Sequence, residues 1–177
     1  QGLSYLPLRA FCPRLHEMIQ LRPLLGLRSP VNTLTRMLNP LAAPASVQSI
    51  FHPAYAALHQ EADRLLGQPH ALVLKGDSGE IEVKPQADTR LQLLRSEVSE
   101  EIVLPRSINH KIAPVAQPAT APLRALWRDE GDDAYGLHAV LATTAAALLV
   151  LQPEWDLARC QEHSRTLWAN RDPARLG

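Results

Sequence analysis

The hydrophobic pattern predicts that strands and helices alternate in the middle of the chain. Residues 53–67, PAYAALHQEADRLLG, space their apolar side chains three and four apart and end at Gly67, as expected for an amphipathic helix. Residues 46–51 favour a strand, and the apolar run 71–75 is typical of a strand buried on both faces of a parallel sheet. Together these segments predict a βαβ unit. The helix face that we expect to be buried consists of Tyr55, Leu58, Ala62, Leu65 and Leu66.

The second half of the chain has two kinds of pattern. Apolar and polar positions alternate within residues 80–84 and within residues 89–95. This pattern predicts a pair of strands with one solvated face. Residues 105–122 are rich in proline and lack periodicity, so an extended connection is expected there. Two closing helices are predicted, one from about Asp133 to Gln152 and the other from Glu154 to Asn170.

Proline and glycine divide the N-terminal region into short elements. A weakly alternating strand is expected at residues 2–6, and Pro13 can begin a helix that closes at Pro23 and Gly26. Ser29 then offers an N-cap for a second helix that ends near Asn39. Both helices are expected to be short.

These elements predict an α/β fold with a mostly parallel sheet and helices on both faces. The expected organisation is an α/β core over residues 1–104, the proline-rich connection at 105–122 and C-terminal helices at 123–177 that pack on the same domain. Because the chain opens in mid-pattern at QGLSYLPL, we expect the fold to be incomplete here, with an upstream helical domain and the first strands missing.

The charge distribution changes this picture more than the composition does. The whole chain has 18 basic and 18 acidic residues, but one stretch near the N-terminus contains five arginines and only one acid, Glu17. A local cationic surface that could bind phosphate through guanidinium groups is expected, although solvated arginines alone would give the same pattern. These arginines are Arg9, Arg14, Arg22, Arg28 and Arg36.

Two further features bear on the location of the protein. Cys12 and Cys160 match no metal or redox spacing, so reduced cysteines in a cytoplasmic protein are expected. The apolar run 137–151 is shorter than the roughly 20 residues of a membrane helix. We therefore expect no association with a membrane.

The turn at residues 75–82, KGDSGEIE, is the candidate ligand site of the predicted sheet. Ligands of open parallel sheets bind beyond the carboxyl ends of the strands. Gly76 and Gly79 would let backbone amides approach a ligand, and Asp77, Glu80 and Glu82 could hold Mg²⁺ that in turn holds phosphates. A solvated glycine-containing hairpin would have the same composition, so this pattern alone leaves both alternatives open.

The stretch at residues 21–42, LRPLLGLRSPVNTLTRMLNPLA, resembles a segment of anthranilate phosphoribosyltransferases with the pattern VR-x-x-LG-x-R-T-x-FN-x-LGPL-x-NP. The matching positions are Arg22, Leu25-Gly26, Arg28, Asn32, Leu34, Leu38 and Asn39-Pro40. The later strand and turn resemble the HG-x-DG-x-DE element of this family, and the closing helices resemble its C-terminal pair.

The resemblance implies a nucleoside phosphorylase and phosphoribosyltransferase fold of glycosyltransferase family 3, represented here by its C-terminal part. It further implies a phosphoribosyl diphosphate donor, Mg²⁺ as cofactor, and metal binding at Glu82. The residues that it implies for substrate or phosphate binding are Arg22, Arg28, Asn32, Gly76 and Gly79.

The departures from the family pattern concern catalysis. Ile81 and Glu82 stand where the family has an Asp-Glu pair that binds metal, and Lys75 replaces the leading histidine of that motif. An isoleucine offers no oxygen to Mg²⁺. The glycine-rich diphosphate loop of the family does not occur in these 177 residues.

The chain is more similar to the YbiB-type paralogues of this family, which are associated with nucleic-acid binding. The residues that carry this similarity are the P-L-x-x-x-C-P-x-L run at 7–15, His52-Pro53-Ala54-Tyr55 and G-x-x-GE at 76–80. The resemblance implies a homodimer when the protein is full length. It also favours a hypothesis in which the arginines bind the phosphates of DNA or RNA without sequence specificity. The alternative hypotheses are a Mg²⁺-dependent phosphoribosyl transferase and a partner-binding scaffold.

Overall fold

The computed structural model describes residues 2–26, 30–76, 80–110, 112 and 120–176, and it divides the chain into two compact units, residues 1–42 and 43–177. The first unit consists of short helices. These are α1 (Leu8–Phe11), α2 (Pro13–Gln20), α3 (Arg22–Leu25), α4 (Val31–Leu34) and the 3-10 helix η1 (Thr35–Met37).

Proline and glycine lie at helix boundaries of the first unit, but the single helix predicted from Pro13 to Gly26 is divided into α2 and α3, and Pro23 lies in the first turn of α3. Pro13 occupies the first turn of α2, where its missing N–H costs nothing. Gly26 ends α3 in the left-handed region at φ 69°, which glycine adopts without strain. The strand expected at residues 2–6 is not formed. Val31 is the one apolar side chain that is buried among the described residues of this unit.

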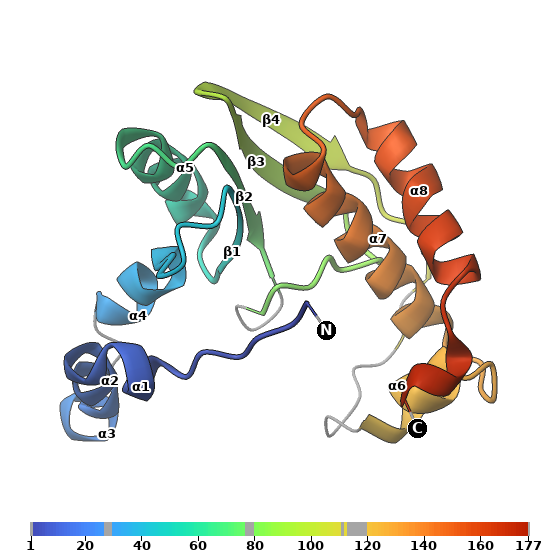
Figure 1. Ribbon diagram of the computed structural model, residues 1–177, viewed down its shortest axis with the longest axis horizontal. Helices are drawn as coiled ribbons and strands as arrows, with labels where there is room; N and C mark the ends of the chain where they lie inside the picture. The colour runs from blue at the N-terminus through green and yellow to red at the C-terminus, as the bar shows by residue number, and fades with distance from the viewer. Residues whose placement is uncertain (1, 27–29, 77–79, 111, 113–119, 177) are drawn as a thin grey trace. The chain divides into compact units, whose positions relative to one another are not determined.

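The second unit contains a four-stranded sheet in the order β1-β2-β3-β4 (Figure 1). Strand β1 (Ala45–Ile50) pairs in parallel with β2 (His70–Lys75). Strand β3 (Thr89–Arg95) is antiparallel to both β2 and β4 (Val98–Leu104). The α/β class is confirmed, and the sheet is mixed where the sequence predicts a mostly parallel one.

The antiparallel part of the sheet differs from the predicted strand pair. Residues 80–84 do not form a strand, because the amide of Val83 is bound by the Thr143 hydroxyl at 3.0 Å and its side chain is buried in the core. Strand β3 instead pairs with β2 on one side and with β4 on the other, and the sequence pattern did not predict β4. The two-residue turn between them places Ser96 and Glu97 at φ 48° and 72°, as in the hairpin turns that match strand twist.

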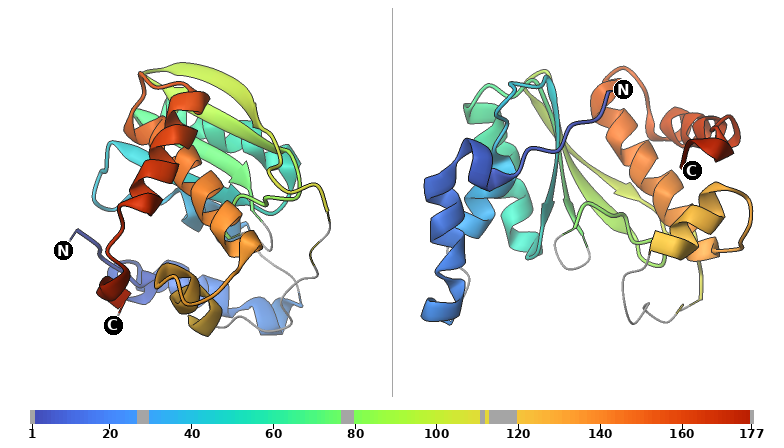
Figure 2. Two further views of the ribbon diagram at one scale, coloured as in Figure 1. Left: turned by 90° about the vertical axis from the view of Figure 1, so that its right-hand side faces the viewer. Right: turned by 60° about the horizontal axis from the view of Figure 1, so that its bottom comes forward.

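Helices cover both faces of this sheet, as predicted. The 3-10 helix η2 (Pro53–Tyr55) leads into α5 (Ala56–Leu65), which packs on β2 and β3. On the other face, α7 (Ala134–Leu151) lies against β1, β2 and β3, with α8 (Leu157–Ala169) beside it. Figure 2 shows α5 and α7 on opposite sides of the sheet.

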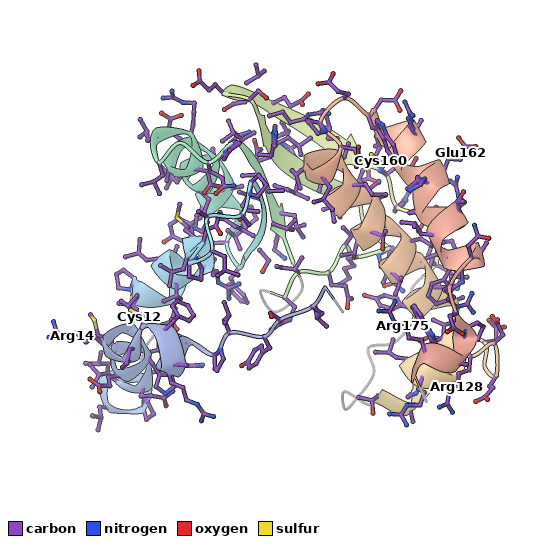
Figure 3. The ribbon with its side chains drawn as sticks, viewed as in Figure 1. Cys12, Arg14, Arg128, Cys160, Glu162 and Arg175 are labelled. Atoms are coloured by element: carbon purple, nitrogen blue, oxygen red, sulfur yellow. The ribbon has the colours of Figure 1, made fainter. Side chains whose placement is uncertain are left out.

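The face of the sheet below α7 holds the main apolar core. Side chains of β2, β3 and β4 meet the second half of α7 there, and Cys160 of α8 completes the layer, as the inward position of Cys160 and the outward position of Glu162 indicate in Figure 3. Burial raises the pKa of the Cys160 thiol. The fully buried members of this core include Leu72, Leu74, Leu91, Leu93 and Leu149.

Helix α7 is long and apolar enough to cross a membrane by length and mean hydropathy, which is 1.8 over its 18 residues. No other helix in the described part of the chain meets both conditions. In this structure α7 packs on the sheet, as the core helix of an α/β domain does. Asp133 caps its first turn by accepting a hydrogen bond from the Gly136 amide at 2.9 Å, in agreement with the predicted start.

The side chain of Arg171 connects the C-terminal segments to one another. Helix α6 (Thr120–Trp127) begins inside the proline-rich connection expected at 105–122 and continues beyond it, and the 3-10 helix η4 (Pro173–Leu176) closes the described chain. Arg171 donates hydrogen bonds to the carbonyl oxygens of Trp127 and Trp168, both at 2.9 Å, and its guanidinium stacks on the Trp168 ring. The side chain of Arg171 is therefore a structural tie between α6 and α8.

Helix α5 packs through the face opposite to the predicted one. Three of its polar residues, His59, Gln60 and Asp63, are buried against the sheet. The leucines expected to be buried are exposed, with 72% of the Leu65 side chain and 62% of Leu58 accessible. The prediction for this face is wrong, because hydrogen bonds to β1 and β3 fix the orientation of the helix.

Candidate functional site

Gly76 and Glu80, on either side of residues 77–79 in the predicted ligand turn, approach each other closely. A Cβ atom on Gly76 would lie 1.5 Å from the carbonyl oxygen of Glu80, so only glycine fits at this position. The predicted site residue Gly79 lies outside the described residues, as do its neighbours 77 and 78. Backbone packing therefore accounts for the glycine at position 76 without a ligand. The side chain of Glu80 is exposed.

Glu82 is the carboxylate that the structure places in a defined environment. Its Oε1 accepts a hydrogen bond of 3.0 Å from the hydroxyl of Tyr135, which lies in the first turn of α7. The next residue, Val83, donates its amide to Thr143. Two hydrogen bonds therefore hold residues 82 and 83 against α7, while the Ile81 side chain remains 49% exposed.

A cavity of about 520 Å³ lies between this segment, the start of α6 and the first half of α7. Its apolar wall is formed by Ile81, Pro122, Leu123, Ala139 and Val140. Its polar groups are Glu82, Asp133, Tyr135, Thr143 and Thr144. No lysine, arginine or histidine of the described residues lines it, so the charged groups that the structure places there, Glu82 and Asp133, are both negative.

The residues described here do not fit the implied Mg²⁺. Magnesium requires a near-octahedral set of oxygen ligands at short distances, and Ile81 supplies none. No three His, Cys, Asp or Glu side chains gather into a possible metal cluster in the described part of the chain. Of the predicted ligands, Asp77 lies outside the described residues, Glu80 is exposed, and Glu82 lines the cavity.

The predicted phosphate-binding arginines lie in the first unit. Arg9, Arg14 and Arg22 are exposed and belong to α1, α2 and α3 in turn, and Arg14 projects outward from α2 in Figure 3. Arg36 is half-buried in η1. Arg28 lies outside the described residues.

Asn32, the remaining predicted substrate residue, is half-buried in α4. Arg22 and Asn32 thus belong to the first unit, whereas Gly76 and Glu82 belong to the second. The structure brings Glu82 together with Tyr135 and Thr143, three residues that no single motif connects. The sequence signal for Tyr135 was weak, because a tyrosine in the first turn of a helix rich in alanine and leucine is unremarkable.

Comparison with known proteins identifies several relatives. The chain is 30% identical over 161 residues to an anthranilate phosphoribosyltransferase from Novosphingobium aromaticivorans, an alignment that covers 84% of this chain and 47% of that protein. It is 32% identical over 107 residues to an uncharacterized protein from Aquifex aeolicus, covering 60% of this chain and 34% of that protein. The chain is therefore a distant relative of proteins named anthranilate phosphoribosyltransferase.

The relatives also include the uncharacterized protein YbiB from Escherichia coli, to which the chain is 28% identical over 95 residues. That alignment covers 52% of this chain and 29% of YbiB. The chain therefore spans between 29% and 47% of the length of these three relatives. No family model matches the chain.

Proposed function

We propose that this phosphoribosyltransferase-like protein binds the phosphate backbone of DNA or RNA, without sequence specificity, through the arginines of residues 1–42. The observation that carries the proposal is the exposure of Arg9, Arg14 and Arg22 on successive helices of a unit whose sequence has one acid, Glu17. Exposed guanidinium groups bind phosphate oxygens through paired hydrogen bonds.

The local environment of these arginines favours an anionic partner. Arg9, Arg14 and Arg22 form no ion pair with another described residue, so binding a phosphate would not require an existing pair to break. The first turn of α2, which contains Arg14, has no acidic residue and no side-chain cap. The positive end of this helix dipole therefore adds to the arginine charge.

The test is fluorescence anisotropy of the full chain with labelled single-stranded and double-stranded oligonucleotides at two salt concentrations. We expect binding that weakens steeply with salt, because each phosphate contact releases counterions. The triple variant Arg9→Gln, Arg14→Gln, Arg22→Gln should lower the salt slope by about three, roughly one for each lost contact.

A matched control removes three exposed arginines from the second unit instead, at positions Arg106, Arg124 and Arg175. This variant has the same net charge as the first and should retain both the affinity and the salt slope. Binding that is insensitive to salt, or equal loss in both triple variants, would contradict the proposal.

The same proposal assigns the whole protein to the cytoplasm as a homodimer, in keeping with the resemblance. Sedimentation of the full-length protein tests the dimer. Cell fractionation tests the location.

A second candidate function is transfer of a phosphoribosyl group with Mg²⁺, which the similarity to proteins named anthranilate phosphoribosyltransferase favours. Catalysis of this kind depends on a metal and cations that stabilise the diphosphate leaving group. Ile81 removes one of the two carboxylates for that metal, so we expect little activity. An assay of anthranilate with phosphoribosyl diphosphate and Mg²⁺ separates the two functions, and turnover at ordinary enzyme rates would reverse their order.

A further inference from the structure

We propose that the cavity between residues 81–82 and α7 binds a small organic cation, an amine carried on an aromatic or branched hydrocarbon body. The cavity belongs to the second unit, residues 43–177, and involves none of the arginines of the proposed nucleic-acid surface. It is therefore a separate site with a separate test.

The size and shape of the cavity suit such a ligand. Its volume of about 520 Å³ lies within the usual range for small-molecule pockets, about 300 to 1,000 Å³. Ala139, Val140 and Leu123 form a wall that would exclude water from a hydrocarbon group. The ligand gains affinity from that wall because apolar surface is removed from water.

The charges of the cavity select a cation. Glu82 and Asp133 are its acidic residues, and none of the lysines, arginines and histidines that the structure describes lines it. A carboxylate or phosphate ligand would therefore meet only like charge. An ammonium group placed beside Glu82 would form a hydrogen bond assisted by both charges.

The hydrogen bonds of the site leave acceptor capacity for that ammonium group. Tyr135 donates to Oε1 of Glu82 and fixes the carboxylate, whereas the Oε2 atom forms no hydrogen bond with any residue that the structure describes. Asp133 is occupied in part by its bond from the Gly136 amide. Glu82 is thus the principal recognition group, and Thr144 adds a hydroxyl at the same wall.

The experiment is isothermal titration calorimetry of the full chain with four probes: 2-phenylethylamine, its neutral analogue 2-phenylethanol, the anion 3-phenylpropionate, and Mg²⁺ as its chloride. We expect saturable binding of the amine, with the alcohol and the carboxylate at least tenfold weaker. Amide chemical shifts of Gly136 and Thr143 should move when the amine is added and not when Mg²⁺ is added.

Two variants locate the site. Glu82→Gln keeps an oxygen for the Tyr135 hydroxyl but removes the charge, and it should weaken amine binding at least tenfold. Val140→Phe fills the apolar wall and should abolish binding, with an unfolding midpoint that verifies the fold. Glu130→Gln removes an exposed acid outside the cavity and should leave binding unchanged.

Several results would overturn the proposal. These are equal affinity for the amine and the alcohol, no amine binding to the unaltered protein, Glu82→Gln binding as tightly as the parent, or Mg²⁺ binding that depends on Glu82 while the amine does not bind. Each would show that the cavity does not recognise an organic cation.

Discussion

The two faces of the sheet differ in the polar side chains that they bury. Below α7, leucines of β2 and β3 meet alanine, leucine and valine, and the layer is apolar. Below α5, the interface contains Gln48, His59, Gln60 and Asp63, all less than 9% exposed. The face below α7 is thus stabilised by area removed from water. The face below α5 also buries apolar residues such as Val73 and Leu94, but it depends in addition on the geometry of its hydrogen bonds.

The polar layer is a connected network in which Gln48 of β1 is the centre. The Gln48 amide group donates to both carboxylate oxygens of Asp63 at 2.9 Å. Its Oε1 therefore points to His59, whose Nδ1 donates to it at 2.9 Å. Gln60 donates to the carbonyl oxygens of Leu93 and Glu100, which ties α5 to β3 and β4. This network fixes the rotation of α5 that the apolar pattern did not predict.

The largest expected effect is on the apolar face. Leu93→Ala removes a side chain that is fully buried, and loss of transfer energy together with the remaining cavity should lower the free energy of unfolding by about 2–5 kcal/mol. Urea unfolding followed by circular dichroism measures this value. A cost below about 1 kcal/mol would contradict the close packing of this face.

Prediction from sequence succeeds for elements of the apolar face and fails in part for the polar face. Predicted boundaries agree closely for α7, which begins after Asp133 and ends before Gln152, and for β3 at residues 89–95. These segments obey period and capping rules because their burial follows their apolar residues. The position of α5 in the sequence was predicted correctly, but the face that it buries was not. Long-range hydrogen bonds to β1 override the local amphipathic pattern.

Part of the candidate site could also be predicted from the sequence, and part could not. Gly76 and Glu82 were identified from a turn next to a buried strand, and the structure gives both a local role. Tyr135 was missed because it lies 53 positions away from Glu82 in the sequence. Contacts of this range depend on how the helices cover the sheet, which residue spacing does not encode.

The next effect concerns the pH dependence of the polar face. Burial raises the pKa of the Asp63 carboxyl, and the hydrogen bond from Gln48 opposes this only in part. Between the unfolded pKa of about 3.9 and the raised folded value, the folded state binds more protons than the unfolded state. Stability from this group is therefore lost as pH rises through that window.

Asp63→Asn keeps an oxygen for the Gln48 amide and removes the titration. Relative to the parent, the variant should gain stability as pH rises from about 4 and reach a constant difference above the folded pKa, as measured by urea unfolding at a series of pH values. Glu61→Gln is the matched control on the exposed side of α5. A hydrogen bond from Arg64 lowers the pKa of Glu61, so this control should give a pH dependence of the opposite sign.

The smallest expected effect tests the orientation of α5 most directly. The apolar pattern predicts that Leu65 is a core residue, whereas the structure exposes 72% of it. Leu65→Ser should therefore change the free energy of unfolding by no more than about 0.5 kcal/mol, as is usual for surface positions. If the leucine face were packed on the sheet instead, the same substitution would cost several times more and the polar network around Gln48 would have to be exposed. Urea unfolding of this one variant thus decides between local amphipathicity and the buried hydrogen bonds as the cause of the helix orientation.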